Sequence, residues 1–302
     1  MIPDIDLVDL RIFLAVAKHL NFTRAGEEIH LSQPTVSVRI RRLEEQLGVK
    51  LFEQTGKKVS LAEGGRLFEP YAWRVVSALE DSLRAVEEFN GLERGLLNIG
   101  ASTTPGMYLV PKVISEFNRR HPRIGIHLSI KNTREVEQDI VKNEFDLGFV
   151  GGHLITDEVE VVRWLADDIR LVVPPGHPLV FKKVVRLQDL PRQNFVLRER
   201  GSATRALVDT TLSGLGLKVQ TVAELGNPES VKQAVLAGLG IAFLSTFTVG
   251  MELQSKSLVA VKVRGLNLNR ELRIVYRRGK HLGRAAGAFI KTAQELKGNL
   301  FA

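Results

Sequence analysis

Hydroxyl and amide side chains gather at three places where a strand is expected to end and a helix to begin. The runs are Ser102-Thr103-Thr104-Pro105, Gly201-Ser202-Ala203-Thr204 and Asn227-Pro228-Glu229-Ser230. Free backbone N–H groups, the positive end of the helix dipole and hydroxyl donors make such positions suited to binding anions. Ordinary N-capping explains any single run more simply. The two hydroxyl-rich turns, at Ser102 and at Ser202, each follow an expected strand in a different part of the chain. Together they favour a small anionic ligand that both turns would hold.

A second polar cluster stands at the start of a helix expected near the N-terminus. Ser32 is suited to cap this helix, Pro34 fits its first turn and Gly48 fits the position just beyond its end, which together predict a helix from Gln33 to Leu47. Its buried stripe is expected to consist of Val36, Ile40, Leu43 and Leu47. The opposite face carries short polar residues and then cations, namely Gln33, Thr35, Ser37, Val38, Arg41 and Arg42. Such a helix can enter the major groove of DNA, reading base edges near its start and holding phosphates with arginine.

Neighbouring elements would hold this helix in place. Apolar periodicity predicts two helices before it, Leu7 to Ala17 and Thr23 to Ile29. A two-strand hairpin is expected after it, with strands Lys50 to Gln54 and Lys58 to Leu61. This wing would put Lys57 and Lys58 beside a flanking phosphate. The alternative is a three-helix packing unit with an ordinary charged surface.

A close resemblance to the N-terminal domain of LysR-type transcriptional regulators covers turn, recognition helix and wing without a gap, in the segment FTRAGEEIHLSQPTVSVRIRRLEEQLGVKLFEQTGKKVSLAEGG (Phe22 to Gly65). The resemblance implies a winged helix-turn-helix that reads bases with Gln33, Pro34, Ser37 and Val38. Val38 departs from the family, where a long polar or basic residue is common, so an apolar contact to a thymine methyl is the alternative there. Ala62 departs as well, because the family often has threonine at this N-cap position. The residues expected to contact DNA are Thr23, Ser32, Gln33, Pro34, Thr35, Ser37, Val38, Arg39, Arg41, Arg42, Lys57 and Lys58.

A long helix is expected between Glu63 and Asn90, where Pro70 should cause a kink or lie within the early turns. Apolar residues recur along it in steps of three and four, at Phe68, Ala72, Val75, Leu79, Leu83, Val86 and Phe89. This narrow seam is too long for packing on one small domain. It predicts a dimer-forming linker helix, which the resemblance also implies, and the alternative is a helix lying on its own domain. Asn90-Gly91 is a hinge signal.

The remaining two-thirds of the chain alternate between strands and helices, which predicts an α/β fold. The expected strands are Gly95 to Ala101, Ile124 to Ile130, Phe145 to Val150, Arg170 to Val173, Phe195 to Leu197, Val219 to Ala223, Ile241 to Leu244, Leu258 to Val263 and Glu271 to Tyr276. The last strand and a helix near Arg284 to Leu296 should return to the first subdomain. Two chain crossings between two lobes would leave a cleft that can close on a ligand.

Three segments, LRERGSATR, ELGNPESVKQAVLAGLGIAFLS and DIRLVVPPGHPL, resemble the effector domain of the same family, which has the two-lobed fold of type 2 periplasmic binding proteins. The opening ASTTPGMYLVPKVISEF is most similar to regulators of sulfur or carbon assimilation. The residues expected to hold a small anionic or carboxylate inducer, of unknown identity, are Ser102, Thr103, Thr104, Gly152, Ser202, Thr204, Asn227 and Pro228. Arg198, Glu199 and Arg200 form either a charged rim of the cleft or a direct anion site.

These observations predict three parts. Residues 1–62 would form the winged helix-turn-helix and residues 63–92 the linker helix and hinge. Residues 93–302 would form the effector-binding domain, with lobe I at about 93–164 and 266–302 and lobe II at about 165–265.

Composition excludes several classes of protein. Among the 302 residues the hydrophobic fraction is 44% and cysteine is absent, which excludes a disordered chain, a disulfide framework, thiolate zinc sites and cysteine nucleophiles. The formal net charge is +8, but residues 262–302 hold ten basic and two acidic residues, so the excess does not mark one DNA-binding face. The uncharged stretch from Ala234 to Met251 reaches the lower length of a membrane span, yet its glycines and hydroxyl residues favour a helix end followed by a short buried strand.

The sequence also lacks the usual signatures of catalysis and export. It has no GxxxxGK[ST] loop, no HExxH and no G-x-S-x-G, and its seven histidines are scattered without ligand spacing. We therefore expect neither an enzyme nor a bound metal or cofactor. Asp4, Asp6 and Asp9 stand where a signal peptide needs basic and apolar residues, which predicts a cytoplasmic protein with no membrane association.

The resulting prediction is a sequence-specific transcriptional regulator that responds to a metabolite bound between two lobes. By the resemblance it would bind a partly palindromic promoter site in double-stranded DNA as a homotetramer, a dimer of dimers formed through residues 63–90, with RNA polymerase as a further partner. Inducer binding can be coupled to DNA binding only if the inducer binds one arrangement of the lobes more tightly than another. The alternatives are a solute-binding protein and a DNA-organising protein without an inducer.

Overall fold

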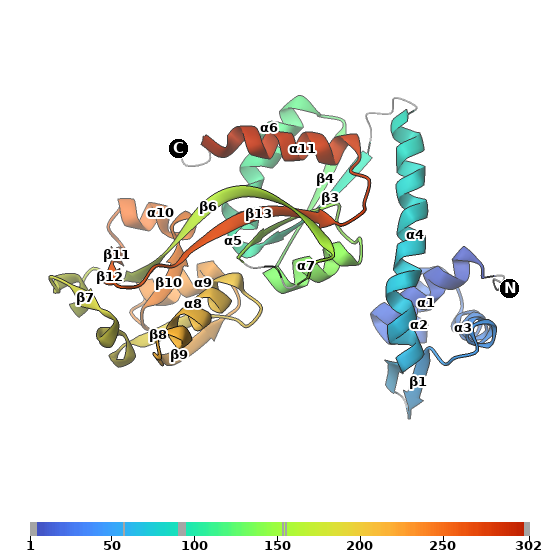
Figure 1. Ribbon diagram of the computed structural model, residues 1–302, viewed down its shortest axis with the longest axis horizontal. Helices are drawn as coiled ribbons and strands as arrows, with labels where there is room; N and C mark the ends of the chain where they lie inside the picture. The colour runs from blue at the N-terminus through green and yellow to red at the C-terminus, as the bar shows by residue number, and fades with distance from the viewer. Residues whose placement is uncertain (1–4, 57, 90–94, 153, 155, 299–302) are drawn as a thin grey trace. The chain divides into compact units, whose positions relative to one another are not determined.

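The computed structural model describes residues 5–56, 58–89, 95–152, 154 and 156–298, and within the long helix it leaves out the side chains of residues 80, 81, 84, 85 and 87–89. The chain divides into two compact units, Met1–Gly91 and Leu92–Ala302. Each unit has its own hydrophobic core, and each is described by itself below (Figure 1).

The N-terminal unit is a winged helix-turn-helix followed by a long helix, as predicted. Its elements are α1 (Leu7–His19), α2 (Phe22–Glu28), α3 (Gln33–Leu47), β1 (Phe52–Thr55), β2 (Lys58–Leu61) and α4 (Glu63–Phe89). Side-chain oxygens of Asp6, Asn21 and Ser32 accept from the first backbone N–H groups of the three short helices. Gly48 ends α3 with φ +70°, a left-handed conformation that glycine adopts without steric cost.

Three aromatic rings join these elements into one core. The Phe13 ring of α1 lies 5.5 Å from the Phe52 ring of β1 and 5.3 Å from the Phe68 ring of α4, measured between centroids. Ala72 and Val76 of α4 are buried in the same cluster. The early turns of α4 are therefore anchored to the winged helix-turn-helix, and Pro70 lies within them.

The predicted seam of α4 divides into two faces. Phe68 and Ala72 pack into the core of the N-terminal unit and are not part of a free surface. A separate apolar stripe remains exposed, with 39% to 68% of each residue accessible, at Leu67, Tyr71, Val75, Leu79, Leu83 and Val86. The side chain of Phe89, the last residue of the predicted seam, lies outside the described part of the chain.

The C-terminal unit contains a mixed sheet with the strand order β10-β6-β13-β5-β3-β4, and β11 pairs with β6 beside this path. Its strands are β3 (Gly95–Ser102), β4 (Ile124–Lys131), β5 (Leu147–Gly151), β6 (Val159–Val173), β7 (Val185–Arg186), β8 (Asn194–Arg198), β9 (Gln220–Leu225), β10 (Ala242–Ser245), β11 (Val259–Val261), β12 (Val263–Arg264) and β13 (Asn269–Arg277). Its helices are α5 (Thr103–Tyr108), α6 (Val110–Arg120), α7 (Thr133–Val141), η1 (Pro178–Phe181), η2 (Leu187–Arg192), α8 (Ala203–Gly214), α9 (Pro228–Leu236), α10 (Thr246–Gln254), α11 (Arg284–Glu295) and η3 (Leu296–Gly298).

Separate cores define two lobes. In lobe I, α6 and α11 cover the sheet, and the core includes Phe117, Phe149 and Phe289. In lobe II, β8, β10 and α8 contribute to a core in which the Phe195 and Phe243 rings stack 5.5 Å apart. The antiparallel strands β6 and β13 pair with each other and run through both lobes (Figure 1).

Three local predictions for the C-terminal unit were wrong. The strand expected from Arg170 is only the end of β6, which begins at Val159 because it crosses both lobes. The strand expected from Leu258 to Val263 is two short strands, β11 and β12, which pair with β6 and β7 respectively. In the uncharged stretch, helix α10 follows β10 and was not predicted.

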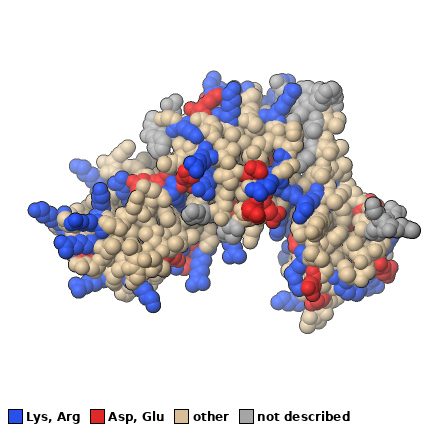
Figure 2. Space-filling model, in the orientation of Figure 1, with Lys and Arg blue, Asp and Glu red and all other residues tan. Residues whose placement is uncertain are grey.

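The uncharged stretch does not form a membrane-spanning element in the described residues, where no helix is both long and apolar enough to cross a bilayer. On the face drawn in Figure 2, the described basic side chains of the C-terminal unit are not gathered into one stripe. Figure 2 shows Lys and Arg scattered over its visible face.

Candidate functional site

The start of α3 presents polar groups to solvent. Ser32 Oγ accepts from Thr35 N at 3.3 Å and lies 2.8 Å from Thr35 Oγ1. Gln33 Nε2 donates to Ser37 Oγ at 3.0 Å, which holds the amide along the helix surface. Gln33, Pro34 and Thr35 are exposed, and Val38 is 63% exposed in the middle of the same face. This face offers hydrogen-bonding groups and one apolar side chain to a groove.

Cations surround this face, and one of them has a partner within the fold. Arg41 and Arg42 are exposed on α3, as is Lys58 on the wing, while Lys57 lies outside the described residues. Arg39 instead forms an ion pair with buried Asp9, Nη1 to Oδ1 3.0 Å, and a longer one with Asp6 at 3.5 Å. The hydrogen bond from Arg39 to Asp9 raises the pKa of Arg39. Of the predicted arginines, Arg39 therefore links α3 to α1.

Glu44 connects the recognition helix to the wing and was not singled out from the sequence. It is 7% exposed, and its carboxylate accepts from Leu51 N at 2.9 Å and Phe52 N at 3.3 Å. Lys50 Nζ lies 2.7 Å from its other oxygen. Because Glu44 occupies a position typical of an exposed helix charge, no local sequence signal marks it.

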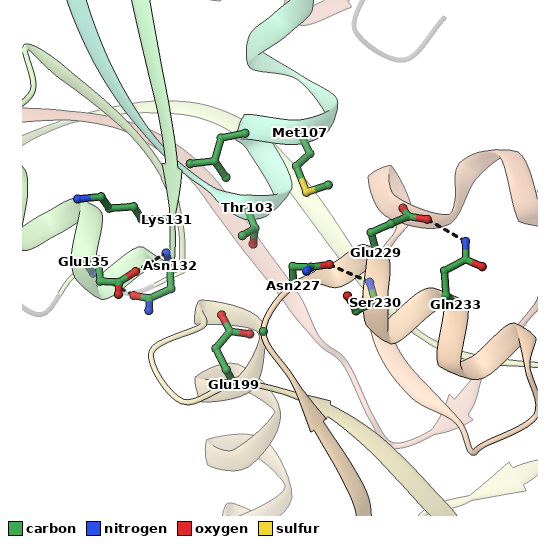
Figure 3. A pocket seen from close by; sticks show the side chains of 12 residues that line it. Thr103, Met107, Lys131, Asn132, Glu135, Glu199, Asn227, Glu229, Ser230 and Gln233 are labelled. Carbon is green, nitrogen blue, oxygen red and sulfur yellow. Dashed lines mark hydrogen bonds between the residues drawn. The ribbon is translucent and has the colours of Figure 1, made fainter.

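A cleft of about 940 Å³ lies between the lobes of the C-terminal unit (Figure 3). Both lobes contribute to its wall, which is formed by Thr103, Met107, Ile130, Lys131, Asn132, Glu135, Glu199, Gly226, Asn227, Glu229, Ser230 and Gln233. Helices α7 and α9 begin at this wall. Asn132 caps α7 by accepting from Glu135 N at 2.9 Å, and Asn227 caps α9 by accepting from Ser230 N at 2.8 Å.

Two of the eight residues predicted to bind the effector, Thr103 and Asn227, line this cleft. Ser102, Thr104 and Pro228 are buried beside it, and Gly152 lies near Ala203 of α8, where an added Cβ would approach the Ala203 Cβ to 3.0 Å. Ser202 is 4% exposed and caps α8, accepting from Arg205 N at 3.5 Å. Thr204 is 4% exposed and its hydroxyl accepts from Arg270 Nη1 at 3.0 Å.

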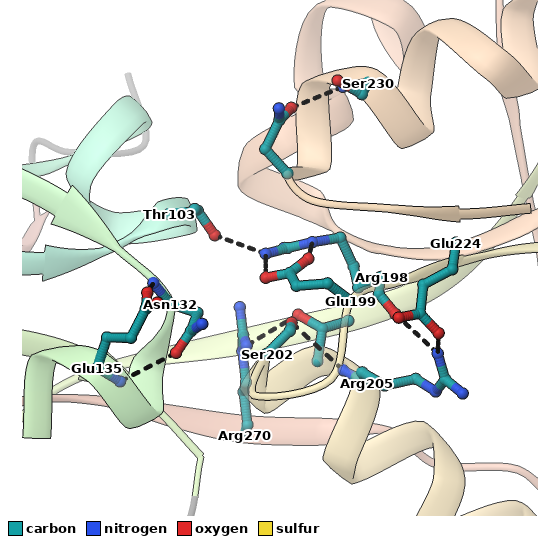
Figure 4. A network of polar contacts seen from close by, with 12 residues as sticks. Thr103, Asn132, Glu135, Arg198, Glu199, Ser202, Arg205, Glu224, Ser230 and Arg270 are labelled. Carbon is teal, nitrogen blue, oxygen red and sulfur yellow. Dashed lines mark hydrogen bonds and ion pairs between the residues drawn. The ribbon is translucent and has the colours of Figure 1, made fainter. Parts of the chain in front are cut away.

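Arg198, at the end of β8, forms a bond across the cleft. Its Nε and Nη2 donate to the two carboxylate oxygens of Glu199 at 2.7 and 2.8 Å. Nη2 also donates to Thr103 Oγ1 of lobe I at 3.0 Å (Figure 4). Arg198 is 4% exposed, so its guanidinium lies behind the Glu199 carboxylate as seen from the cleft.

A second bond joins the lobes on another side of the cleft. Tyr108 Oη of α5 donates to Glu229 Oε2 of α9 at 2.8 Å. Burial, followed by this bond, raises the pKa of Tyr108. Burial also acts to raise the pKa of Glu229, but the bonds from Gln233, Lys232 and Tyr108 outweigh it and lower that pKa. Lys232 is 7% exposed and lies between Glu229 and Glu252, at 2.9 and 2.8 Å.

The charges that line the cleft are mainly negative. Among the described residues, its wall includes the carboxylates Glu135, Glu199 and Glu229 and one cation, Lys131. Lys131 Nζ lies 2.6 Å from Asp139 Oδ2, and this bond raises the pKa of Lys131. Because Lys131 is already paired with Asp139, an anion that enters the cleft needs another cation, one that lies behind the exposed wall. The described residues contain no cluster of three or more acidic, histidine or cysteine side chains that could hold a metal ion.

Family models match both units. The model described as "LysR substrate binding domain" matches residues 90–297, and the one described as "Bacterial regulatory helix-turn-helix protein, lysR family" matches residues 7–66. Among curated relatives, the RuBisCO operon transcriptional regulator of Allochromatium vinosum is 38% identical over 285 residues, which cover 94% of each chain.

Solved structures show the same architecture. Full-length OxyR from Pseudomonas aeruginosa has a TM-score of 0.73 at 23% identity, covering 96% of this chain and 94% of that one. The regulatory domain of Synechocystis PCC6803 CcmR in complex with 2-PG has a TM-score of 0.64 at 26% identity, covering 68% of this chain and 99% of that one. The first likeness supports the fold of the whole chain and the second that of its C-terminal unit.

Proposed function

The chain belongs to the LysR family of transcriptional regulators, and we propose that it reads promoter DNA with α3 and the wing and binds a small anionic effector in the cleft. The observation that carries the DNA-binding part is the exposed start of α3, where Gln33, Thr35 and Val38 share a face with Arg41 and Arg42. Polar groups near a helix start can reach base edges while arginines one or two turns later contact phosphates.

The target genes and the effector class are inferred from relatives. The Allochromatium vinosum protein is named a regulator of the RuBisCO operon, and similarity over almost the whole chain supports a carbon-assimilation operon as the target here. The CcmR domain is described in complex with 2-PG, so we take a small anionic metabolite of this kind as the effector. Thr103 and Asn227 on opposite lobes would donate to it, which would make ligand binding sensitive to lobe closure.

Self-association would use the exposed stripe of α4. Six large apolar side chains at spacings of three and four exceed what a solvated helix normally exposes, and a second copy of α4 would bury them. Two such dimers would form the homotetramer expected for binding two half-sites. We infer no catalytic role and no resident cofactor, and a protein acting on promoter DNA would work in the cytoplasm.

The direct test is a footprint of the full-length protein on the DNA upstream of a RuBisCO operon, with and without 2-PG. We expect protection of a partly palindromic site in the presence of competitor heparin, and an altered protection pattern when 2-PG is added. Absence of any preferred fragment at moderate salt would contradict the DNA-binding assignment. An effector-independent footprint across a panel of anionic metabolites would instead favour a DNA-organising protein.

A further inference from the structure

Glu199 already occupies the best anion-binding position in the cleft. Its two carboxylate oxygens take the Nε and Nη2 donors of Arg198 at 2.7 and 2.8 Å, a bidentate arrangement that suits a carboxylate or a phosphate. The third bond of this guanidinium, 3.0 Å to Thr103 Oγ1, comes from the opposite lobe. An anion bound to Arg198 is therefore linked to both lobes, because the same guanidinium also donates to Thr103.

Burial makes a counter-anion necessary at this position. The Arg198 side chain is 3% exposed, whereas that of Glu199 is 21% exposed. A buried guanidinium without an anionic partner would carry a large desolvation cost. The Glu199 carboxylate lies at the cleft wall and is partly accessible, so it can turn away from Arg198, whereas the buried guanidinium is fixed behind it. Figure 4 shows the contact between the two side chains. An anion that enters from the cleft can therefore replace the Glu199 carboxylate as the partner of Arg198.

The other charges of the cleft lead to the same position. Glu135 accepts from Asn132 N at 3.0 Å as part of the α7 capping box, and Glu229 is held by Tyr108, Lys232 and Gln233. Lys131 is paired with Asp139. Among the described residues of the wall, Glu199 is the carboxylate whose partner is a buried arginine, which lies directly behind it.

We propose that Glu199 is an internal substitute for the effector: its carboxylate neutralises Arg198 in the ligand-free protein and is displaced when the carboxylate or phosphate group of an anionic effector binds to Arg198 and Thr103. This inference rests on the proposed effector site and names the group that recognises the ligand. Displacement exchanges one anionic partner of Arg198 for another, so the buried guanidinium keeps a counter-anion throughout. The effector must carry a group with at least two acceptor oxygens, because a single acceptor cannot replace both bonds to Arg198.

The test compares E199Q with wild type and with the matched control E135Q, all as full-length protein, using inorganic phosphate as the probe. Glutamine at position 199 cannot supply two anionic oxygens, so Arg198 loses its counter-anion. Glutamine at position 135 can still serve in a capping box. In a buffer with low anion content we expect E199Q to melt at a lower temperature than wild type and to be restored by phosphate. Calorimetry should give E199Q a phosphate affinity at least about tenfold higher than wild type or E135Q, a gain of about 1.4 kcal/mol.

Two further variants keep the test decisive. E199D retains the charge but is one methylene shorter, so it should fold and bind phosphate with intermediate affinity. E199Q/T103V should lose part of the gain, because Thr103 would no longer contact the site. The proposal is overturned if E199D and E199Q bind phosphate no better than wild type, or if E199Q fails to fold and E199D matches wild type.

Failure of this inference can be distinguished from failure of the proposed function. If 2-PG alters the DNA footprint but the Glu199 variants show no gain in phosphate affinity, the cleft is the effector site and Glu199 is not a substitute anion. If the variants gain affinity but no anionic metabolite changes the footprint, the anion site exists and the effector assignment is wrong.

Discussion

Arg270 and Asp167 lie opposite each other in β13 and β6, the two strands that cross between the lobes, and their side chains form a buried ion pair with Nη2 2.7 Å from Oδ2. Ser245 Oγ donates to the other oxygen of Asp167 at 2.6 Å, and Arg270 Nη1 donates to Thr204 Oγ1 at 3.0 Å. An added Cβ at Gly151, at the end of β5, would lie 3.1 Å from the guanidinium. The pair thus connects lobe I, the crossing strands and two helix starts of lobe II.

We expect D167N to destabilise the C-terminal unit by about 3–5 kcal/mol, because removing one member of a buried ion pair leaves the other charge uncompensated. Urea unfolding monitored by tryptophan fluorescence measures this change, since Trp164 is buried in lobe I. R264A, an exposed arginine on β12, is the control and should stay within about 0.5 kcal/mol of wild type. A D167N midpoint equal to that of R264A would contradict the role assigned to the pair.

The same pair explains why one part of the fold could not be predicted. Helix α3 follows from residues a few positions apart, since Ser32, Pro34 and Gly48 fix its two ends locally. Strand β6 does not, because Asp167 and Asp168 interrupt its apolar pattern and mimic a turn. The partner that allows Asp167 to be buried is Arg270, 103 residues further along the chain. Only the tertiary fold supplies it.

The arginines of α3 should separate by function. R41A and R42A should each weaken binding to every DNA sequence and reduce the slope of log K against log salt by about 0.9, because each removes one phosphate contact. Anisotropy titrations over a series of salt concentrations measure the slope. R39A should chiefly destabilise the N-terminal unit, because it leaves the buried Asp9 without its cation. Equal salt slopes for wild type, R41A and R42A would remove the phosphate assignment.

Gln33 tests base reading. Its amide is exposed at the start of α3 and bonded only to the Ser37 hydroxyl among the bonds described for its side chain. We expect Q33A to relax specificity by about 1–3 kcal/mol at one base pair while leaving non-specific affinity unchanged. Selection from a randomised site library gives the preference at each position. An identical preference profile for Q33A and wild type would show that Gln33 does not contact a base.

The stripe on α4 predicts a change of assembly. L79E would place a charge in the middle of the expected contact between two copies of the helix, so the dimer should dissociate. Sedimentation velocity over a range of concentrations measures this effect. V8E, at an apolar residue of α1 that is 41% exposed, introduces the same charge outside the stripe and should leave the assembly intact. Equal sedimentation of L79E and wild type would mean that another surface forms the dimer.

The candidate effector site shows how far residue type alone can predict a ligand contact. The run Ser102-Thr103-Thr104 and the cap at Asn227 do place Thr103 and Asn227 at the cleft wall. Ser202 and Thr204 have similar residue types but are each 4% exposed and do not line the cleft, and their hydroxyls bond to Arg205 N and Arg270. A capping hydroxyl and a ligand-binding hydroxyl produce one sequence pattern, and only the packing around each decides which it is.

The bond between Tyr108 and Glu229 predicts a dependence on pH in the alkaline range. Because burial and this bond raise the pKa of Tyr108, the folded protein holds the phenol proton more tightly than the unfolded chain, in which tyrosine ionises near pH 10. The stabilisation is therefore complete below about pH 10 and decreases as the pH rises above it. Y108F lacks the proton and the bond, so its free energy of unfolding should be lower than that of wild type at pH 8, and the difference should shrink at about pH 11.

Tyrosinate absorbance provides the second measurement of this effect. Because the pKa of Tyr108 is raised, its phenol should stay protonated near pH 10, so the absorbance titrations of wild type and Y108F should superimpose there. If Y108F shows less tyrosinate absorbance than wild type near pH 10, the Tyr108 phenol ionises normally in the wild-type protein. The bond to Glu229 would then not hold the lobes together in solution.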